Sequence, residues 1–361
     1  MTKRTDKLTN RPIHGSITSA ELRELGVSID DVIDFSSNIN PLGVSPRVSA
    51  AMSAADASRY PDPDCLELRE ALSRRTNIGV ESIIVGNGST ELIHLIVRAF
   101  AADRQIVIAA PTYGEYEFAC RLAEREPVFI RSLEETKFKH DIAALIRRIE
   151  EAKPSLVFLC NPNNPIGVYL KRSDVELIAT AAKPGLLVLD EAYVPFVERP
   201  WNSNALIESG DVIILHSMTK DHALAGVRLG YALAPETIVA KLKQLQPFWS
   251  VNAIAQVMGL AALEDDDHVR KGREEVLAAK AYLEKEIAHL GLTAIPSSAN
   301  FILVKVGDAP SMRRQLLRHG LCVRDCTSFG MPQYIRISIR TLAECKRLAD
   351  GLKAVVGGNR Q

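Results

Sequence analysis

Short apolar runs alternate with longer amphipathic stretches between about residues 64 and 235. Because these runs are rich in β-branched residues and are bounded by turn-forming residues, they predict strands. The expected strands are Ser82–Val85, Gln105–Ala109, Pro127–Arg131, Ser155–Cys160, Leu186–Leu189, Val212–His216 and Leu229–Leu233. The stretches between them predict helices such as Glu91–Ala101, Ile142–Ala152 and Ser173–Ala182. Strand and helix alternation on this scale predicts an α/β fold with a mainly parallel sheet covered on both faces.

The pattern changes after Pro235, where the apolar positions follow a helical period over about 236–264 and 267–290. A smaller α+β unit follows, with strands expected near Asn300–Val304, Cys322–Arg324 and Tyr334–Ile339 and helices near 310–319 and 342–355. The first 40 residues carry little periodicity. We therefore expect three parts: an N-terminal arm (1–45) packed on the small domain, a large domain (46–260) and a small C-terminal domain (261–361).

Composition excludes several classes of protein. The chain has 361 residues, of which 47% are hydrophobic and 24% charged, and its 44 Lys and Arg balance 44 Asp and Glu. This balance argues against a nucleic-acid binder or a membrane-surface protein. No signal peptide or membrane span is expected. The six cysteines form no CxxC pair and have no His at zinc spacing, so we expect a cytoplasmic protein with reduced thiols and no metal site.

Three polar islands each follow a predicted strand: Asn161-Pro162-Asn163-Asn164-Pro165-Ile166-Gly167, Asp190-Glu191-Ala192-Tyr193 and Ser217-Met218-Thr219-Lys220. Ligands of open α/β sheets bind beyond the carboxyl ends of the strands. Taken singly, each island has an ordinary structural interpretation: a surface lysine, a capping carboxylate or a turn asparagine. Together they supply an amine for a Schiff base, a carboxylate for a ring nitrogen and donors for a phenolate oxygen, as pyridoxal 5′-phosphate requires.

Over nearly its whole length the chain resembles the fold-type-I pyridoxal-phosphate enzymes, which implies a large domain with a seven-stranded sheet. The resemblance implies that Lys220 binds the cofactor, that Asp190 faces its ring nitrogen, and that Tyr193 and Asn164 reach its phenolate oxygen. A cofactor-free binding protein that inherited this scaffold is the rival interpretation, and the joint presence of Lys220, Asp190, Tyr193 and Arg228 argues against it.

Further residues are assigned to the cofactor by the same resemblance. The segment Gly88-Ser89-Thr90 opens a helix after a strand and suits a phosphate dianion, because glycine allows close approach and the helix N-terminus offers free amides. Ser217 and Arg228 are expected to complete this phosphate site, and Tyr113 to stack on the ring. Tyr60 is expected to reach the phosphate in the neighbouring subunit of a homodimer.

Substrate residues are also implied by the resemblance: Arg336 for the α-carboxylate, together with Arg324, Asn38 and His14. Among fold-type-I enzymes the chain is most similar to L-threonine-O-3-phosphate decarboxylases, which implies a role in cobalamin biosynthesis, and to histidinol-phosphate aminotransferases. The stretches that favour decarboxylases are residues 34–43, Thr219-Lys220 and 249–253.

Two departures from the decarboxylase pattern leave other reactions open. His14-Gly15-Ser16 stands where His-Gly-Gly is usual, and Asp221-His222 follows the lysine where an aromatic-containing pair is usual. Because of the favouring stretches, we still expect first a decarboxylase of an anionic, phosphorylated α-amino acid. The alternatives are an aminotransferase for histidinol phosphate or a related amine, and an enzyme of elimination or cyclisation. All three act on small molecules.

Overall fold

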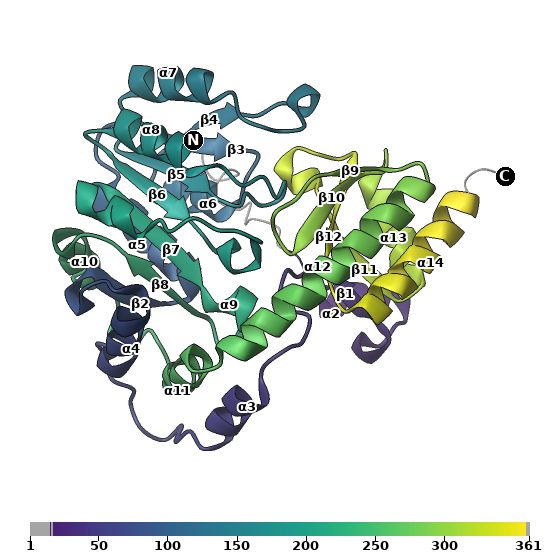
Figure 1. Ribbon diagram of the computed structural model, residues 1–361, viewed down its shortest axis with the longest axis horizontal. Helices are drawn as coiled ribbons and strands as arrows, with labels where there is room; N and C mark the ends of the chain where they lie inside the picture. The colour runs from purple at the N-terminus through teal and green to yellow at the C-terminus, as the bar shows by residue number, and fades with distance from the viewer. Residues whose placement is uncertain (1–14, 16, 359–361) are drawn as a thin grey trace, which may run out of the picture.

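Two lobes, each built around a β-sheet, make up the protein (Figure 1). The computed structural model describes Gly15 and residues 17–358. Within these residues the larger lobe holds a seven-stranded sheet in the order β2-β8-β7-β6-β5-β3-β4. Only β8 runs antiparallel to its neighbours, so the mainly parallel α/β sheet predicted from the sequence is confirmed. Its strands are β2 (Ile83–Asn87), β3 (Ile106–Ala110), β4 (Val128–Arg131), β5 (Leu156–Cys160), β6 (Leu186–Asp190), β7 (Val212–Ser217) and β8 (Leu229–Leu233).

Helices cover both faces of this sheet, as the uninterrupted apolar strands require. In β6, Leu187 and Leu189 enter the core under one face, whereas Val188 enters the core under the other. Helices α3, α4, α7, α8 and α11 pack on the first core, and α5, α6 and α10 on the second. Their bounds are α3 Pro46–Ser53, α4 Leu66–Thr76, α5 Gly88–Phe100, α6 Glu115–Leu122, α7 Ile142–Ala152, α8 Arg172–Ala182, α10 Glu236–Lys243 and α11 Ala253–Leu263, and the short α9 spans Met218–Asp221.

The smaller lobe is built on a five-stranded sheet, counted over the same described part of the chain, in the order β1-β11-β12-β10-β9. Strand β1 comes from the N-terminal segment and pairs in parallel with β11, so this segment joins the small sheet as an edge strand. Three helices pack on the sheet around a core of their own. The elements are α2 (Ser19–Leu25), β1 (Ile33–Phe35), α12 (Asp266–His289), β9 (Thr293–Ile295), β10 (Phe301–Lys305), α13 (Ala309–Arg318), β11 (Leu321–Asp325), β12 (Tyr334–Ser338) and α14 (Leu342–Gly358). The domain boundaries expected at residues 45 and 260 stay predictions.

One element prediction was wrong. The helical pattern over 236–264 is two helices, because α10 ends at Lys243 and α11 begins only at Ala253. Pro247 lacks an amide hydrogen, Trp249 has a left-handed backbone with φ of 57°, and the Asn252 side chain caps α11. The apolar positions of α10 and α11 follow nearly the same helical period, so the sequence pattern does not reveal the break between them. The sequence pattern also left α2, α3, α4, α6, the short α9 and the three-residue strands β1 and β9 unpredicted.

Single-turn 3₁₀ helices connect several elements: η1 (Ile29–Asp31), η2 (Val80–Ser82), η3 (Glu134–Thr136), η4 (Val194–Phe196) and η6 (Thr327–Phe329), with a longer one at η5 (Asn204–Ser209). No helix among the described residues has the length and apolar character to cross a membrane. All six cysteines are buried free thiols.

Gly230 in β8 carries a testable packing constraint. A Cβ atom there would lie 2.5 Å from the backbone nitrogen of Ser89 and 2.9 Å from the carbonyl oxygen of His216. Because both obstacles are backbone atoms in regular elements, Gly230→Ala is expected to lower the free energy of unfolding by about 3 kcal/mol, near the upper end for overpacking. Urea denaturation measures this change.

Gly226 provides the matched control, since a Cβ atom at that position would have no neighbour within 4 Å. Gly226→Ala is expected to change the free energy of unfolding by no more than about 0.5 kcal/mol. Equal effects of the two substitutions would contradict the packing argument.

Candidate active site

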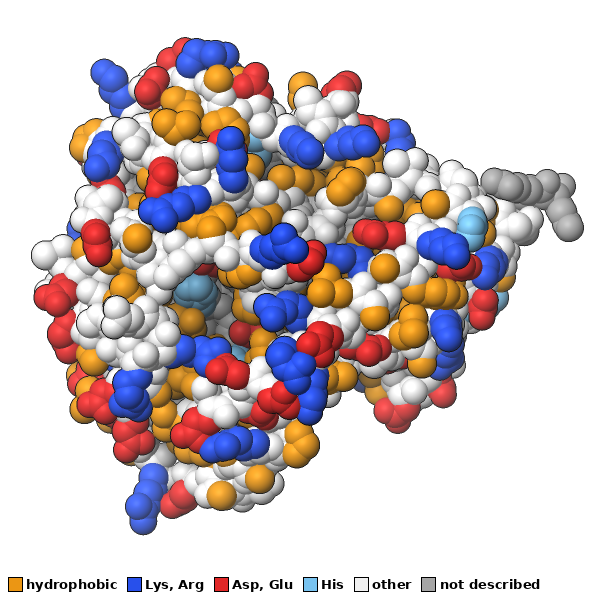
Figure 2. Space-filling view, in the orientation of Figure 1, with side chains coloured by type: hydrophobic (Ala, Val, Ile, Leu, Met, Phe, Trp, Pro, Cys, Tyr) orange, Lys and Arg blue, Asp and Glu red, His pale blue; other side chains and the backbone are white. Residues whose placement is uncertain are grey.

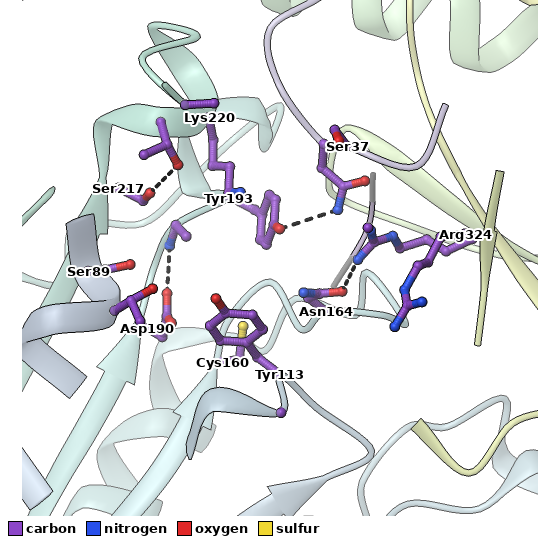
Figure 3. Close-up of a pocket in the computed structure, with 18 of the residues that line it drawn as sticks. Ser37, Ser89, Tyr113, Cys160, Asn164, Asp190, Tyr193, Ser217, Lys220 and Arg324 are labelled. Atoms are coloured by element: carbon purple, nitrogen blue, oxygen red, sulfur yellow. Dashed lines mark hydrogen bonds between the residues drawn. The ribbon is translucent and has the colours of Figure 1, made fainter. Parts of the chain in front are cut away.

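A cavity of about 650 Å³ opens at the carboxyl ends of β5, β6 and β7 and is lined by both lobes. Lys and Arg side chains gather where the two lobes meet on the face in Figure 2. Most of the sequence-predicted site residues line this cavity: Asn38, Ser89, Thr90, Tyr113, Asn164, Asp190, Tyr193, Ser217, Lys220, Arg228, Arg324 and Arg336. Figure 3 shows several of them pointing toward a common space. The fold therefore brings together segments that are up to 298 residues apart, from position 38 to position 336.

Lys220 lies in α9, directly after β7, and its side chain enters the cavity. Its Nζ atom lies 5.9 Å from the centre of the Tyr193 ring. Among the described residues, Nζ has no hydrogen-bond or ion-pair partner. Burial, and then the positive charges of Arg336 and Arg228, lower the pKa of Lys220 to about 8. An amine with this pKa is partly neutral near pH 8, which makes it a nucleophile and a proton acceptor.

Asp190 ends β6 and is buried. Its Oδ2 atom accepts a hydrogen bond of 2.6 Å from the Tyr116 hydroxyl, and its Oδ1 atom accepts one of 3.0 Å from the Ala192 amide. Burial raises the pKa of Asp190, while these two hydrogen bonds and the charge of Lys220 act in the opposite direction. The carboxylate is thus held in a fixed orientation beside the cavity.

Tyr116 is a functional candidate that the sequence-based prediction missed. It lies on α6, is fully buried and stacks on Phe158 with ring centres 4.8 Å apart. An aromatic residue on an amphipathic helix is normally interpreted as part of the core, so the sequence alone does not predict the hydrogen bond from Tyr116 to Asp190.

A chain of polar contacts joins the two lobes across the cavity. The Asn38 amide donates to the Tyr193 hydroxyl at 3.3 Å. The Arg336 guanidinium donates from Nη1 to the Asn164 side-chain oxygen and from Nη2 to the Ser36 carbonyl at 2.7 Å. Both acceptors are neutral, and no carboxylate within the described residues pairs with Arg336. A buried guanidinium in this state is a ready site for an anion.

The start of α5 forms a cradle whose shape and donors suit an anion. Gly88 has a φ of 72°, and a Cβ atom there would lie 2.9 Å from Nη2 of Arg228. Gly88 itself does not line the cavity, but Ser89, Thr90, Ser217 and Arg228 do. Free amides at the N-terminus of a 13-residue helix, with a guanidinium beside them, suit a phosphate group. This cradle, the buried carboxylate and the buried amine fit pyridoxal phosphate.

Arg324 occupies the small-lobe side of the cavity. It donates to the Ser328 hydroxyl at 2.6 Å, and its guanidinium carbon lies 5.4 Å from the centre of the Phe329 ring. Burial, and then the charge of Arg336, lower the pKa of Arg324 to about 10. Ser36, Cys160, Glu117, Phe118 and Arg121 also line the cavity and were not among the expected site residues.

Other predicted residues lie elsewhere. Tyr60 is 80% exposed and stacks on Trp249 outside the cavity, with ring centres 4.5 Å apart. His14 lies outside the described residues. Neither Asp221, the last residue of α9, nor His222, which follows it, lines the cavity. The sequence-based reason for an elimination or cyclisation reaction therefore falls away.

The low pKa of Lys220 can be measured in the cofactor-free protein. Its neutral fraction rises with pH through the folded-state pKa, so acylation of Nζ is expected to be half-maximal near pH 8, compared with 10.5 for an ordinary lysine. Mass spectrometry of the labelled peptide gives the profile. In Arg336→Ala the midpoint is expected to move upward, because a repelling positive charge is removed. A midpoint near 10.5 in the unsubstituted protein would contradict the burial argument.

Comparison with known proteins agrees with this geometry. Residues 30–352 match the family model for aminotransferase class I and II. The chain belongs to this family. The histidinol-phosphate aminotransferase of Moorella thermoacetica is 37% identical over 343 residues, which cover 92% of this chain and 87% of that protein.

Solved structures of this aminotransferase family superpose over most of the chain. The histidinol-phosphate aminotransferase of Sinorhizobium meliloti, solved in complex with pyridoxal 5′-phosphate, has a TM-score of 0.86 at 25% identity and covers 99% of this chain and 98% of its own. The L-threonine-O-3-phosphate decarboxylase of Porphyromonas gingivalis has a TM-score of 0.76 at 25% identity and covers 90% and 99%. The expected fold-type-I fold, enzyme class and pyridoxal-phosphate cofactor are confirmed.

Proposed function

We propose that this aminotransferase takes its amino group from a phosphorylated amine of the histidinol phosphate type. The observation that carries this proposal is the buried Arg336, whose guanidinium meets neutral acceptors and so supports a substrate anion in this position. Arg324 supplies a second buried positive charge beside it. Relatives that are 32–37% identical over at least 92% of the chain carry the name histidinol-phosphate aminotransferase.

The cofactor would be held by residues of the larger lobe. Lys220 is placed to bind its aldehyde, and Asp190 to pair with its ring nitrogen. Tyr113 is placed to cover one ring face. The phosphate would lie in the cradle at the start of α5. The phenolate oxygen would contact the side chains of Tyr193, on the loop after β6, and Asn164, on the loop after β5. In full, the proposed cofactor residues are Gly88, Ser89, Thr90, Tyr113, Asn164, Asp190, Tyr193, Ser217, Lys220 and Arg228.

Bound pyridoxal phosphate supplies an aldehyde that condenses with amines and a ring that accepts electrons from a neighbouring carbon. The side chains around the cavity determine which proton moves and how the substrate is oriented. Lys220, with its pKa near 8, can take a proton from the substrate Cα at Nζ and deliver it again. Asp190 would pair with the ring nitrogen of the bound cofactor, and its orientation is fixed by hydrogen bonds from Tyr116 and Ala192. Arg336 and Arg324 orient the substrate by its anion.

Decarboxylation of O-phospho-L-threonine is the second candidate. Two neighbouring arginines could hold a carboxylate and a phosphate together, and the Porphyromonas gingivalis neighbour bears the name of such a decarboxylase. The two reactions differ in which bond of the substrate Cα stands perpendicular to the plane of the electron-accepting ring: the bond to hydrogen or the bond to the carboxylate. A preference of roughly 1000-fold corresponds to only about 4 kcal/mol. The relatives' names favour transamination, and the expectation of a role in cobalamin biosynthesis stays a prediction that depends on the decarboxylase candidate.

A donor test separates the two candidates. Holoenzyme mixed with histidinol phosphate alone is expected to lose the visible absorbance band of its cofactor and to regain it when 2-oxoglutarate is added. With O-phospho-L-threonine, no carbon dioxide is expected. Release of carbon dioxide without any need for an oxo acid would replace the proposed function with the decarboxylase.

We further propose that the enzyme acts as a homodimer and that Tyr60 reaches the cofactor site of the partner subunit. Tyr60, Phe248 and Trp249 form an exposed aromatic cluster on one chain. Such a cluster is unusual on a monomer surface. Light scattering measures the mass in solution, and a monomer would refute this arrangement. Asn38, which contacts Tyr193, and His14 stay proposed substrate residues.

A further inference from the structure

We propose that Glu117 and Arg121 of α6 together select the side chain of the amino donor, and that they select a ring with both an N–H donor and a bare nitrogen acceptor, such as imidazole. This inference rests on the proposed function, since it concerns the second end of the same substrate. It assigns a specificity role to two residues that the cofactor and the anion do not use.

The two side chains form a pair at the wall of the cavity. Both line it, one helical turn apart, and Nη2 of Arg121 lies 2.5 Å from Oε1 of Glu117. The two side chains are 31% and 32% exposed, so ligands can reach them. Across the described residues, Glu117 Oε2 and Arg121 Nη1 have no hydrogen-bond partner, and Arg121 Nε is buried without one. The pair therefore offers an acceptor and a donor side by side.

The distribution of charged side chains in the cavity indicates which part of the substrate this pair would contact. Asp190 and Glu117 are the carboxylates among the described lining residues. Asp190 is already bonded to Tyr116 and Ala192 and faces the cofactor position. Glu117 is thus the carboxylate that is available to the substrate. Arg336 and Arg324 lie on the other lobe, so the cavity has a cationic side for an anion and a side with a carboxylate for an N–H group.

Histidinol phosphate matches this arrangement, because its phosphate and its imidazole ring extend on opposite sides of the carbon that bears the amine. A neutral imidazole has one N–H donor and one acceptor nitrogen, which complement Glu117 and Arg121 respectively. Phe118 and Phe329 line the same cavity and provide apolar surface for a flat ring. O-phospho-L-threonine carries a carboxylate in place of the ring and so lacks the N–H donor that the Glu117 carboxylate would accept.

The test compares two donors that differ only in the ring: histidinol phosphate and alaninol phosphate. The measured quantity is the ratio of their kcat/KM values. In Glu117→Gln this ratio is expected to fall about tenfold, which corresponds to about 1.4 kcal/mol, because the glutamine oxygen can still accept a hydrogen bond but loses the charge that strengthens it. Calorimetric binding of the two compounds to holoenzyme is expected to show the same loss of preference.

Glu176→Gln is the matched control, because Glu176 forms the same i,i+4 pair with Arg172 on α8, outside the cavity. The control ratio is expected to equal that of the unsubstituted enzyme. If histidinol phosphate is bound but not turned over, the proposed function fails while the binding ratio still tests the pair. An unchanged ratio in Glu117→Gln, both in turnover and in binding, would overturn the inference.

Discussion

Replacing Lys220 with alanine is expected to lower kcat by about 10⁴-fold, near the upper limit for loss of a general acid–base group, and to abolish covalent attachment of the cofactor. The cavity holds no second lysine among its described lining residues, so no other amine can substitute. Activity assays measure the first effect. Reduction with borohydride followed by mass spectrometry measures the second, with the label expected on the peptide that contains position 220.

Lys241→Ala is the control for this prediction. Lys241 lies on α10 against the Phe100 ring, with Nζ 4.5 Å from its centre, and does not line the cavity. Its removal is expected to leave kcat and labelling unchanged. A label on another lysine, or kcat within about tenfold of the unsubstituted enzyme in Lys220→Ala, would show that the cofactor is not bound here.

Asp190→Asn is expected to lower kcat by about 10³-fold, the scale for loss of one preorganised electrostatic group at a reacting centre. The substitution removes the negative charge and keeps the size of the side chain. An asparagine oxygen can still accept the Ala192 amide, so the fold should persist. Steady-state kinetics give kcat, and circular dichroism checks the fold.

Tyr116→Phe gives a graded comparison for the same carboxylate. It deletes the 2.6 Å hydrogen bond to Asp190 but leaves the charge and the stacking on Phe158. Its effect on kcat is expected to be about tenfold, since a hydrogen bond to a charged group contributes about 1.5–3 kcal/mol and water can replace part of it. If Asp190→Asn were as active as Tyr116→Phe, the charge of Asp190 would have no role in the reaction.

The elements of the fold were largely predictable from local pattern. In β6, for example, the four residues from Leu186 to Leu189 are all apolar because both faces of the sheet are covered, so consecutive residues in the sequence are enough to predict the strand. The interruption between α10 and α11 was not predicted, because a helical period on either side of Pro247 looks continuous. The edge strand Ile33–Phe35 was missed for a different reason: three residues carry too little pattern, and its partner Leu321–Asp325 lies far away in the sequence.

The order of polar islands after strands, together with the resemblance to the fold-type-I enzymes, was enough to predict the cofactor chemistry. Lys220, Asp190 and Asn164 follow predicted strands, and parallel strands end at one edge, so their convergence follows from topology. Contacts between side chains from distant segments do not follow from it. The Tyr116 bond to Asp190, the neutral partners of Arg336, the position of His222 away from the cavity and the pairing of Glu117 with Arg121 inside it depend on how the two lobes and α6 pack. The sequence determined the cofactor chemistry, because residue type and strand order encode it. Only the tertiary structure decided which side chains surround the rest of the cavity, because their contacts depend on angles and distances between elements that no local pattern records.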